Sequence, residues 1–230
     1  MSKRLRDNKL TNSYAMIMSS PSEIVSATID YIGSDVLSCP SQFIDVFMER
    51  AEEIYFEQER QAIQEVIRET YGESGIEQLI EELDLLMDFF MSVFQSRRAR
   101  AGRALETAIS ILFWHYKIPF ESARINGKPD FIIPSVEAYR DNPLNCFVLT
   151  TKRKVRERWR QIVTEGARIR VFHLFTLDTD LSNDTIREMS QNGVKLVTTA
   201  KIKEDHYADN SNVITIEEFI DSAIKQIARY

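Results

Sequence analysis

The sequence has few cysteines and no long apolar run. Its two cysteines, Cys39 and Cys146, lie far apart and neither belongs to a CxxC pair, which argues against a disulfide framework or a cysteine-based metal site and favours two buried free thiols. No run of 18 apolar residues occurs, so a membrane-spanning helix is not expected. The first 20 residues lack the continuous apolar stretch of a signal peptide, and we therefore expect a cytoplasmic protein with a partly mobile N-terminal tail.

Length and composition indicate a folded protein whose charge is unevenly distributed. The chain has 230 residues, 43% of them apolar and 10% aromatic, which suits one globular domain with a core and argues against disorder. The net charge is −6, and acidic residues crowd the stretch from Glu49 to Glu82. Basic residues form two groups, one of Arg97, Arg98, Arg100 and Arg103 and one of Lys152, Arg153, Lys154, Arg156, Arg158 and Arg160. Such a local basic surface can bind phosphates although the total charge is acidic.

The first half of the sequence predicts helices. Residues 20–23, Ser-Pro-Ser-Glu, are typical of a helix start, with proline at the first position and glutamate in the first turn. Apolar residues at helical spacing predict a long helix that opens at Ser41 and stops near Tyr71-Gly72. Ser74 and Glu77 form a capping box for the next helix, which extends to about Phe90. A further helix is expected from about residue 100 to residue 116.

After Lys117 the pattern changes to short strands that alternate with helices. Strands are expected at residues 130–133, 145–151, 169–175 and 194–198, with helices at 183–191 and after the Thr215/Glu218 capping box. This order predicts an α/β core in which helices flank both faces of a mixed β-sheet, preceded by a helical N-terminal half. His115 and His173 stand among apolar residues, and we expect core histidines rather than metal ligands.

Asp130, Lys152 and Glu165 have the chemistry that phosphodiester hydrolysis requires. Carboxylates are hard ligands for a divalent cation, and the cation neutralises charge at the phosphate and activates a water. Asp130 opens one strand, Lys152 ends the next, and Glu165 follows on a helix, so the three side chains can meet at one end of a sheet. The backbone carbonyl of Thr151 is a further possible ligand. Taken separately, a Pro-Asp pair and a strand-end lysine are common, and a solvated strand end also explains Lys152.

Longer stretches around these residues resemble one family. They are NGKPDF at 126–131, TTK at 150–152, RERWRQ at 156–161 followed by Glu165, RAGRALE at 100–106, and Pro134-Ser135 with Ala138-Tyr139. Together they resemble the EcoRII-like type II restriction endonucleases of the PD-(D/E)xK superfamily, in the group that recognises CC…GG sites, over about residues 95–175. In that group the second metal-binding carboxylate has moved from the strand to the helix. The sequence shows this departure, because Thr150 stands two residues before Lys152 and the acid is Glu165.

The resemblance implies a role for each matching residue. Asp130 and Glu165 would bind Mg²⁺, Lys152 would position or polarise the attacking water, and Glu106 would be an accessory acid at the site. Without the resemblance, Glu106 would be interpreted as an exposed helix carboxylate.

The resemblance also implies how the DNA is read. Arg156, Glu157 and Arg158 match the cluster that reads the CC:GG base pairs, since arginine bonds guanine O6 and N7 and a carboxylate accepts from cytosine N4. A charged helix face with local ion pairs is the alternative, but one acid among so many bases leaves most of the charge unpaired. Arg160 and Lys154 are expected to contact phosphates or to support the cluster. Gln95 is expected to contact the minor groove. Phosphate contacts are also expected from Arg97, Arg98, Arg100 and Arg103.

These expectations combine into one functional hypothesis and two alternatives. The first is a Mg²⁺-dependent homodimeric endonuclease that cuts double-stranded DNA 5′ of the first C of a CC(N/W)GG-type site, since a two-fold site matches a two-fold protein. Residues 1–95 would form a helical region for dimerisation and the DNA cleft, and residues 96–230 the nuclease core. The alternatives are a repair or structure-selective nuclease of the same fold and a non-catalytic DNA-binding protein.

Overall fold

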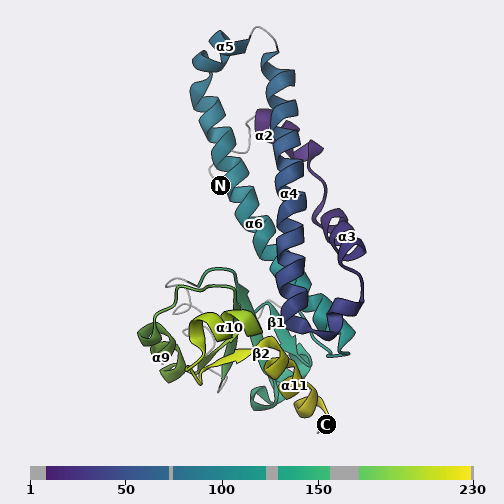
Figure 1. The fold of residues 1–230 in the computed structure, drawn as a ribbon, viewed down its shortest axis with the longest axis vertical. Coiled ribbons are helices and arrows are strands. Elements are labelled where there is room, and N and C mark those ends of the chain that lie inside the picture. The colour runs from purple at the N-terminus through teal and green to yellow at the C-terminus, as the bar shows by residue number, and fades with distance from the viewer. Residues whose placement is uncertain (1–8, 73–74, 123–128, 156–170, 229–230) are drawn as a thin grey trace. The chain divides into compact units, whose positions relative to one another are not determined.

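The chain folds into two compact units. The computed structural model describes residues 9–72, 75–122, 129–155 and 171–228. The N-terminal unit comprises Met1–Gly33 and Phe47–Ala104, and the core unit comprises Ser34–Val46 and Leu105–Tyr230. Two long helices, α4 (Pro40–Tyr71) and α6 (Leu83–His115), contribute residues to both units (Figure 1). The functional division at residue 95 stays a prediction, and α6 is continuous through that position.

The described residues of the N-terminal unit form helices and the turns that connect them, with no strand. It contains α2 (Lys9–Ile17), α3 (Pro21–Ile32), most of α4, α5 (Gly75–Glu81) and the first two thirds of α6. The predicted start of α3 is confirmed: the Ser20 hydroxyl accepts from the Glu23 N–H, and the Glu23 carboxylate accepts from the Ser20 N–H. Its core is a cluster of apolar side chains from α2, α4 and α6, among them Leu10, Tyr14, Ala62, Val66, Phe89 and Val93.

The helix α6 differs from the expected pair of helices. It runs unbroken for 33 residues, from Leu83 to His115, although the sequence analysis separates helices ending near residue 90 and starting near residue 100. The physical reason is that residues 91–99 contain neither glycine nor proline, so nothing interrupts the backbone hydrogen bonds. The helix expected at 74–90 instead ends at Glu81, and α6 begins two residues later.

The core unit is built on a mixed sheet, as predicted, and the sheet has five strands. Strands β1 (Phe131–Ile133), β2 (Phe147–Lys152), β3 (Phe172–Thr176), β4 (Val194–Thr198) and β5 (Val213–Thr215) lie in that order across the sheet. β1 is antiparallel to β2, and the remaining pairs are parallel. The short strand β5 is not in the sequence prediction, because three residues directly before a capping box give little periodic signal. The other elements are η1 (Asp35–Ser38), α7 (Val136–Asp141), η2 (Pro143–Asn145), α9 (Asn183–Gln191), α10 (Ala200–Tyr207) and α11 (Ile216–Ile227).

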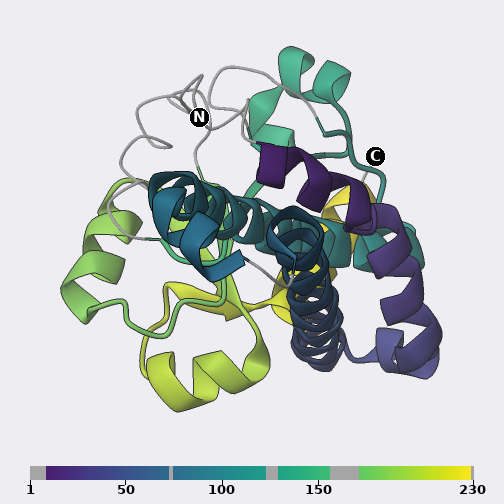
Figure 2. The same cartoon turned by 90° about the horizontal axis from the view of Figure 1, so that it is seen from above.

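Helices cover both faces of the sheet. Successive strand residues point to opposite faces, so the buried strands place side chains on both faces that need to be covered. Val148, Leu174 and Leu196 pack with Ile186 of α9 and Tyr207 of α10, and these two helices lie near each other in Figures 1 and 2. The rings of Phe147 and His173 face Phe219 of α11 at centroid distances of 5.6 and 5.0 Å. Phe113 of α6 contacts Phe131 of β1 at 5.4 Å. The predicted α/β core with two helical layers is therefore confirmed.

Two of the expected core residues are exposed. His173 and Cys146 are buried as predicted, whereas His115 and Cys39 are exposed. Both exposed residues stand at element ends: His115 is the last residue of α6, and Cys39 directly follows η1. Apolar neighbours in sequence therefore did not ensure burial at these ends. None of the helices in the described ranges combines the length and the apolar character that crossing a bilayer requires.

Candidate active site

Asp130 and Lys152 lie together where the start of β1 meets the end of β2. The two strands are antiparallel and Phe131 pairs with Leu149, so the residue before β1 lies beside the last residues of β2. Lys152 Nζ is 3.7 Å from Asp130 Oδ2. The lysine side chain is 38% exposed and the aspartate side chain 19%, so a ligand can reach both groups from solvent.

Thr151 fixes the orientation of the Asp130 carboxylate. Its backbone N–H donates to Asp130 Oδ2 over 2.6 Å, and its hydroxyl donates to the same oxygen over 3.0 Å. Thr151 is itself buried, so both donors are held by packing. The sequence analysis names only the backbone carbonyl of Thr151, as a possible metal ligand. The role of the hydroxyl is indicated in the sequence only by the position of Thr151 on a strand, next to Lys152.

Thr150 stands where the PD-(D/E)xK pattern has an acid on the strand. It is buried, and its hydroxyl has no hydrogen-bond partner among the described residues. Thr150 and Lys152 are two residues apart on β2 and therefore point to the same face of the sheet. The strand thus brings a neutral side chain to the position from which a second carboxylate would reach the site.

Glu106 belongs to the core unit and is partly buried on α6. It precedes Phe113 by seven residues, which is about two helical turns, so the two side chains share a face of α6. Phe113 packs against Phe131, the residue next to Asp130. The face of α6 that carries Glu106 is therefore the face turned towards β1, as an accessory role requires.

The donor set at this place fits a hard divalent cation in part. Asp130 offers a carboxylate oxygen, the ligand type that Mg²⁺ prefers. Among the residues that the structure describes, no three His, Cys, Asp or Glu side chains form a cluster that could hold a metal ion. The second predicted ligand, Glu165, lies outside the described residues. Asp130 therefore fits as one ligand of a set that the described residues do not complete.

The predicted base-reading cluster, Arg156, Glu157 and Arg158, also lies outside the described residues, as does Arg160. Its described neighbour Lys154 donates to Asp178 over 3.0 Å and to Asp180 over 2.7 Å. The hydrogen bond with Asp180 is the largest cause of a raised pKa of Lys154, and the bond with Asp178 is the next largest.

Asp178 also anchors the chain that leads to the predicted base-reading cluster. It is buried, and its carboxylate accepts the backbone N–H of Val155 over 2.9 Å. Together with the Lys154 pair, this contact fixes the backbone immediately before residue 156, which favours a supporting role for Lys154 over a phosphate contact.

The basic residues of the N-terminal unit divide into two kinds. Gln95, Arg98 and Arg103 are exposed. Arg97 and Arg100 instead form ion pairs with the buried Glu59. Arg100 is only 7% exposed and also donates to the hydroxyl of Tyr14. The structure thus places Arg100 in an internal ion pair rather than on a surface that a phosphate could contact.

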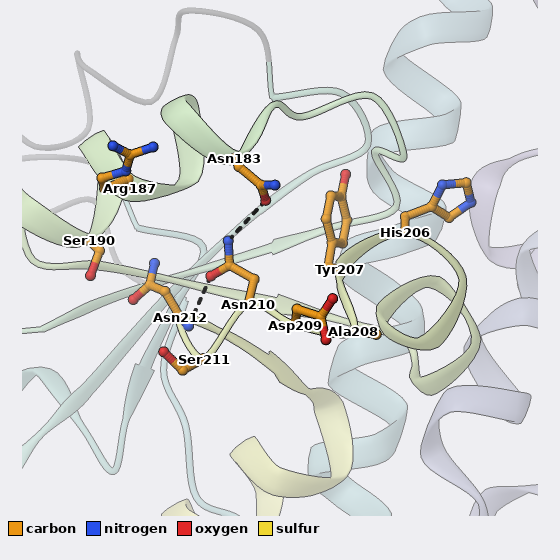
Figure 3. Close-up of a pocket in the computed structure, with 10 residues that line it drawn as sticks. All are labelled: Asn183, Arg187, Ser190, His206, Tyr207, Ala208, Asp209, Asn210, Ser211 and Asn212. Carbon is orange, nitrogen blue, oxygen red and sulfur yellow. Dashed lines mark hydrogen bonds between the residues drawn. The ribbon is translucent and has the colours of Figure 1, made fainter.

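A separate polar pocket of about 400 Å³ lies beside α9 and the loop after α10. Figure 3 shows its lining, in which the Asn210 amide donates to the Asn183 carbonyl oxygen. Asn212 donates to the backbone of Val194, at the start of β4, whereas Lys152 lies at the end of β2. Because β2, β3 and β4 are parallel, the pocket and Asp130–Lys152 are at opposite ends of the sheet.

The sequence matches the family model described as EcoRII C terminal over residues 55–220. It is 32% identical over 153 residues to the type II restriction enzyme SsoII of Shigella sonnei, covering 61% of this chain and 50% of that enzyme. It is 30% identical over 210 residues to the type II restriction enzyme EcoRII of Escherichia coli, covering 87% of this chain and 49% of that enzyme. The chain therefore spans about half the length of the curated relatives it matches.

Solved structures share the fold. Metal-depleted Ecl18kI in complex with uncleaved, modified DNA has a TM-score of 0.83 at 26% identity, covering 94% of this chain and 82% of that one. The complex of the restriction endonuclease PspGI with substrate DNA has a TM-score of 0.76 at 23% identity, covering 96% of this chain and 98% of that one. The family match extends over well more than half of the sequence and includes both Asp130 and Lys152. We conclude that this chain belongs to the EcoRII C-terminal family.

Proposed function

We propose that this chain is a site-specific endonuclease that hydrolyses double-stranded DNA with Mg²⁺ as its cofactor. The observation that carries the proposal is the pair of Asp130 Oδ2 and Lys152 Nζ, 3.7 Å apart, in a chain of the EcoRII C-terminal family. The relatives SsoII and EcoRII are type II restriction enzymes, and the similar structures of Ecl18kI and PspGI are complexes with DNA.

The side chains divide the chemistry between them. Asp130 and Glu165 would hold the metal ion, with Glu106 as an accessory acid. When bound, Mg²⁺ supplies positive charge at the scissile phosphate and makes a water a better nucleophile. Thr151 orients the Asp130 carboxylate through its two hydrogen bonds. The Lys152 ammonium positions the attacking water and stabilises the negative charge that develops on the phosphate.

Sequence specificity would come from the segment that follows β2. Arg156, Glu157 and Arg158 would read two adjacent G·C pairs through the major groove, giving cleavage 5′ of the first C in a CC(N/W)GG-type site. Further DNA contacts are proposed for Arg160, Arg97, Arg98, Arg103 and Gln95. Lys154 and Arg100 would support these groups, because each is paired with a carboxylate.

A two-fold recognition site would be cut by a homodimer of this chain. Residues 1–95 would contribute the dimer contacts and one wall of the DNA cleft, and residues 96–230 the nuclease. Each protomer would then cut one strand, so that a single binding event breaks both.

Digestion of phage DNA tests the proposal directly. Purified protein with Mg²⁺ should produce discrete fragments, and sequencing of their ends should place every cut before CC in a CC(N/W)GG-type sequence. A smear of fragments would refute sequence specificity. Cleavage confined to flaps or branched DNA would indicate a structure-selective nuclease, and binding without cleavage a non-catalytic DNA-binding protein.

A further inference from the structure

A short stretch of chain joins the cutting and the reading parts of the proposed site. We call residues 153–155 the link. They follow Lys152, at the end of β2, and precede Arg156, the first residue of the proposed base-reading cluster. Each residue spans at most about 3.6 Å, so so short a link passes a change in its backbone directly to both of its neighbours. The path of the link therefore decides how the groups that read the DNA stand relative to the Lys152 ammonium.

The Asp178 carboxylate holds the link from the chain that leaves β3. It accepts the backbone N–H of Val155 over 2.9 Å and the Lys154 ammonium over 3.0 Å. A third donor, the backbone N–H of Asp180, lies 3.3 Å from the same carboxylate. The Asp178 side chain is only 5% exposed, and a buried charge is tolerated only where it is paired and hydrogen-bonded. Two of its three donors belong to the link, so this one charge fixes both the backbone and a side chain of the link.

The position of Asp178 is itself fixed on both sides. Its backbone N–H donates to the Thr176 hydroxyl over 3.0 Å, and its carbonyl oxygen accepts the Tyr207 hydroxyl over 2.6 Å. Thr176 pairs with Lys152 in the ladder of β2 and β3, and its hydroxyl donates to the Arg153 carbonyl over 3.4 Å. Thr176 and Tyr207 are both buried. The carboxylate therefore has a fixed place relative to the end of β2.

Packing and hydrogen bonding make different contributions at the link. Val155 is 1% exposed and packs with Val148 and Leu174. Burial of apolar surface is non-directional, so it keeps this side chain in the core without fixing the direction in which the backbone continues. A hydrogen bond has a preferred angle, and one to a charged acceptor is about twice as strong as a neutral one. The bond to Asp178 therefore sets the direction of the chain towards Arg156.

We propose that Asp178 is a positioning residue that keeps base reading and cutting aligned by holding the link. The inference rests on the proposed function and adds to it a residue that acts through the link. With the carboxylate in place, the cluster meets its G·C pairs and Lys152 meets the scissile phosphate in one arrangement of the chain. Without it the link takes several paths, and a duplex with one wrong base pair is bound almost as well as the correct one.

Discrimination between two duplexes tests the proposal. One duplex carries a CC(N/W)GG-type site, the other has a single G·C pair of that site replaced by A·T, and fluorescence anisotropy in Ca²⁺ gives the affinity for each. The wild type should prefer the first by about 10- to 100-fold, whereas Asp178→Ala should prefer it by no more than about threefold. A loss of folded protein lowers both affinities equally and leaves their ratio unchanged, so the ratio reports positioning and not stability.

Two further variants complete the comparison. Asp178→Asn keeps an oxygen that can accept the Val155 N–H and removes the charge that pairs with Lys154, so its ratio should be about threefold below that of the wild type. This variant carries the test if Asp178→Ala does not fold. Asp184→Ala is the matched control, because it removes an exposed carboxylate of α9 that pairs with Arg187, and it should keep the wild-type ratio.

Amide hydrogen exchange checks the link without DNA. The Val155 amide should exchange at least about tenfold faster in Asp178→Ala than in the wild type, and at the wild-type rate in Asp184→Ala. Unchanged exchange at Val155, or wild-type discrimination in Asp178→Ala, would overturn the inference and leave the proposed nuclease standing. A wild-type protein that does not distinguish the two duplexes would refute the site-specific nuclease, and the inference with it.

Discussion

At the scale of single residues, Lys152 is the side chain on which cutting is expected to depend most directly. Lys152→Ala removes the ammonium group beside Asp130, so DNA cleavage should fall by at least about 100-fold while DNA affinity changes little. Cleavage rates and binding to an uncut duplex in Ca²⁺ measure the two effects. Lys225→Ala, an exposed lysine on α11, is the matched control. Cleavage that survives the loss of Lys152 would contradict its role.

Thr151 should act through Asp130 rather than on the DNA. Thr151→Val keeps the shape of the side chain and removes the hydroxyl that donates to Asp130 Oδ2, so the single-turnover cleavage rate should fall by about tenfold. Thr151→Ser restores the donor and should recover most of the rate. If serine and valine reduce the rate equally, packing and not the hydrogen bond is responsible.

His173 should make the stability of the protein depend on pH. Burial, followed by the charge of Lys195, lowers the pKa of His173 to about 4, against a hydrogen bond with the Val148 backbone that raises it. Between pH 6.5 and 4 the unfolded chain binds a proton at this residue that the folded chain does not. The free energy of unfolding should therefore decrease as the pH is lowered from 6.5 to 4, by up to about 3 kcal/mol.

The measurement is urea unfolding at pH 7.5 and pH 4.5. His173→Gln should lose less stability than the wild type between these two values, whereas the exposed His206→Gln should lose as much as the wild type. An identical loss in all three proteins would assign the pH dependence to other groups.

At the scale of elements, a buried charge network links α2, α4 and α6. The Glu59 carboxylate on α4 is 5% exposed and pairs with Arg97 and Arg100 on α6, and Arg100 also donates to Tyr14 on α2. Glu59→Ala leaves Arg100 buried without its counter-charge. Such a loss costs about 3–5 kcal/mol of unfolding free energy.

Urea unfolding of two neighbouring variants checks this expectation. Glu57 lies on the same helix and forms an exposed pair with Arg60, so Glu57→Ala should cost less than about 1 kcal/mol. Replacement of both Glu59 and Arg100 by apolar residues should recover most of the stability that Glu59→Ala removes. Equal losses from Glu57→Ala and Glu59→Ala would show that the network contributes little.

The elements that the sequence predicts well are those set by local chemistry. The helices α3 and α11 begin where the Ser-Pro-Ser-Glu start and the Thr215/Glu218 capping box predict, because these signals involve only residues within one turn of each other. The 33-residue length of α6 was missed, since the gap between two apolar patterns looked like a break. At the site, the proximity of Asp130 and Lys152 could be predicted because both stand at strand ends. The hydrogen bond from the Thr151 hydroxyl to Asp130 could not, because it depends on the register of β1 and β2. The burial of Arg100 in an ion pair could not be predicted, since its partner Glu59 is 41 residues away in the sequence.

At the scale of the whole molecule, the net charge of −6 predicts weak binding to DNA of arbitrary sequence. Binding to the recognition site should instead depend on the local basic groups, so the logarithm of the affinity should fall linearly with the logarithm of the salt concentration, by about 0.9 per phosphate contacted. Fluorescence anisotropy between 50 and 200 mM salt in Ca²⁺ measures this slope. A slope near zero would contradict the phosphate contacts proposed for Arg97, Arg98, Arg103 and Arg160.

The antiparallel pairing of β1 with β2 has a consequence for how this protein can vary. Phe131 and Leu149 are held in register by the ladder itself, and that register alone brings Asp130 to Lys152. The connecting residues 134–146 end in η2, where Leu144 is 66% exposed. Extra residues inserted there would lengthen the connection without shifting the ladder. This connection is therefore where the chain can accept a peptide tag or a natural insertion while the spacing of the two reactive groups is preserved.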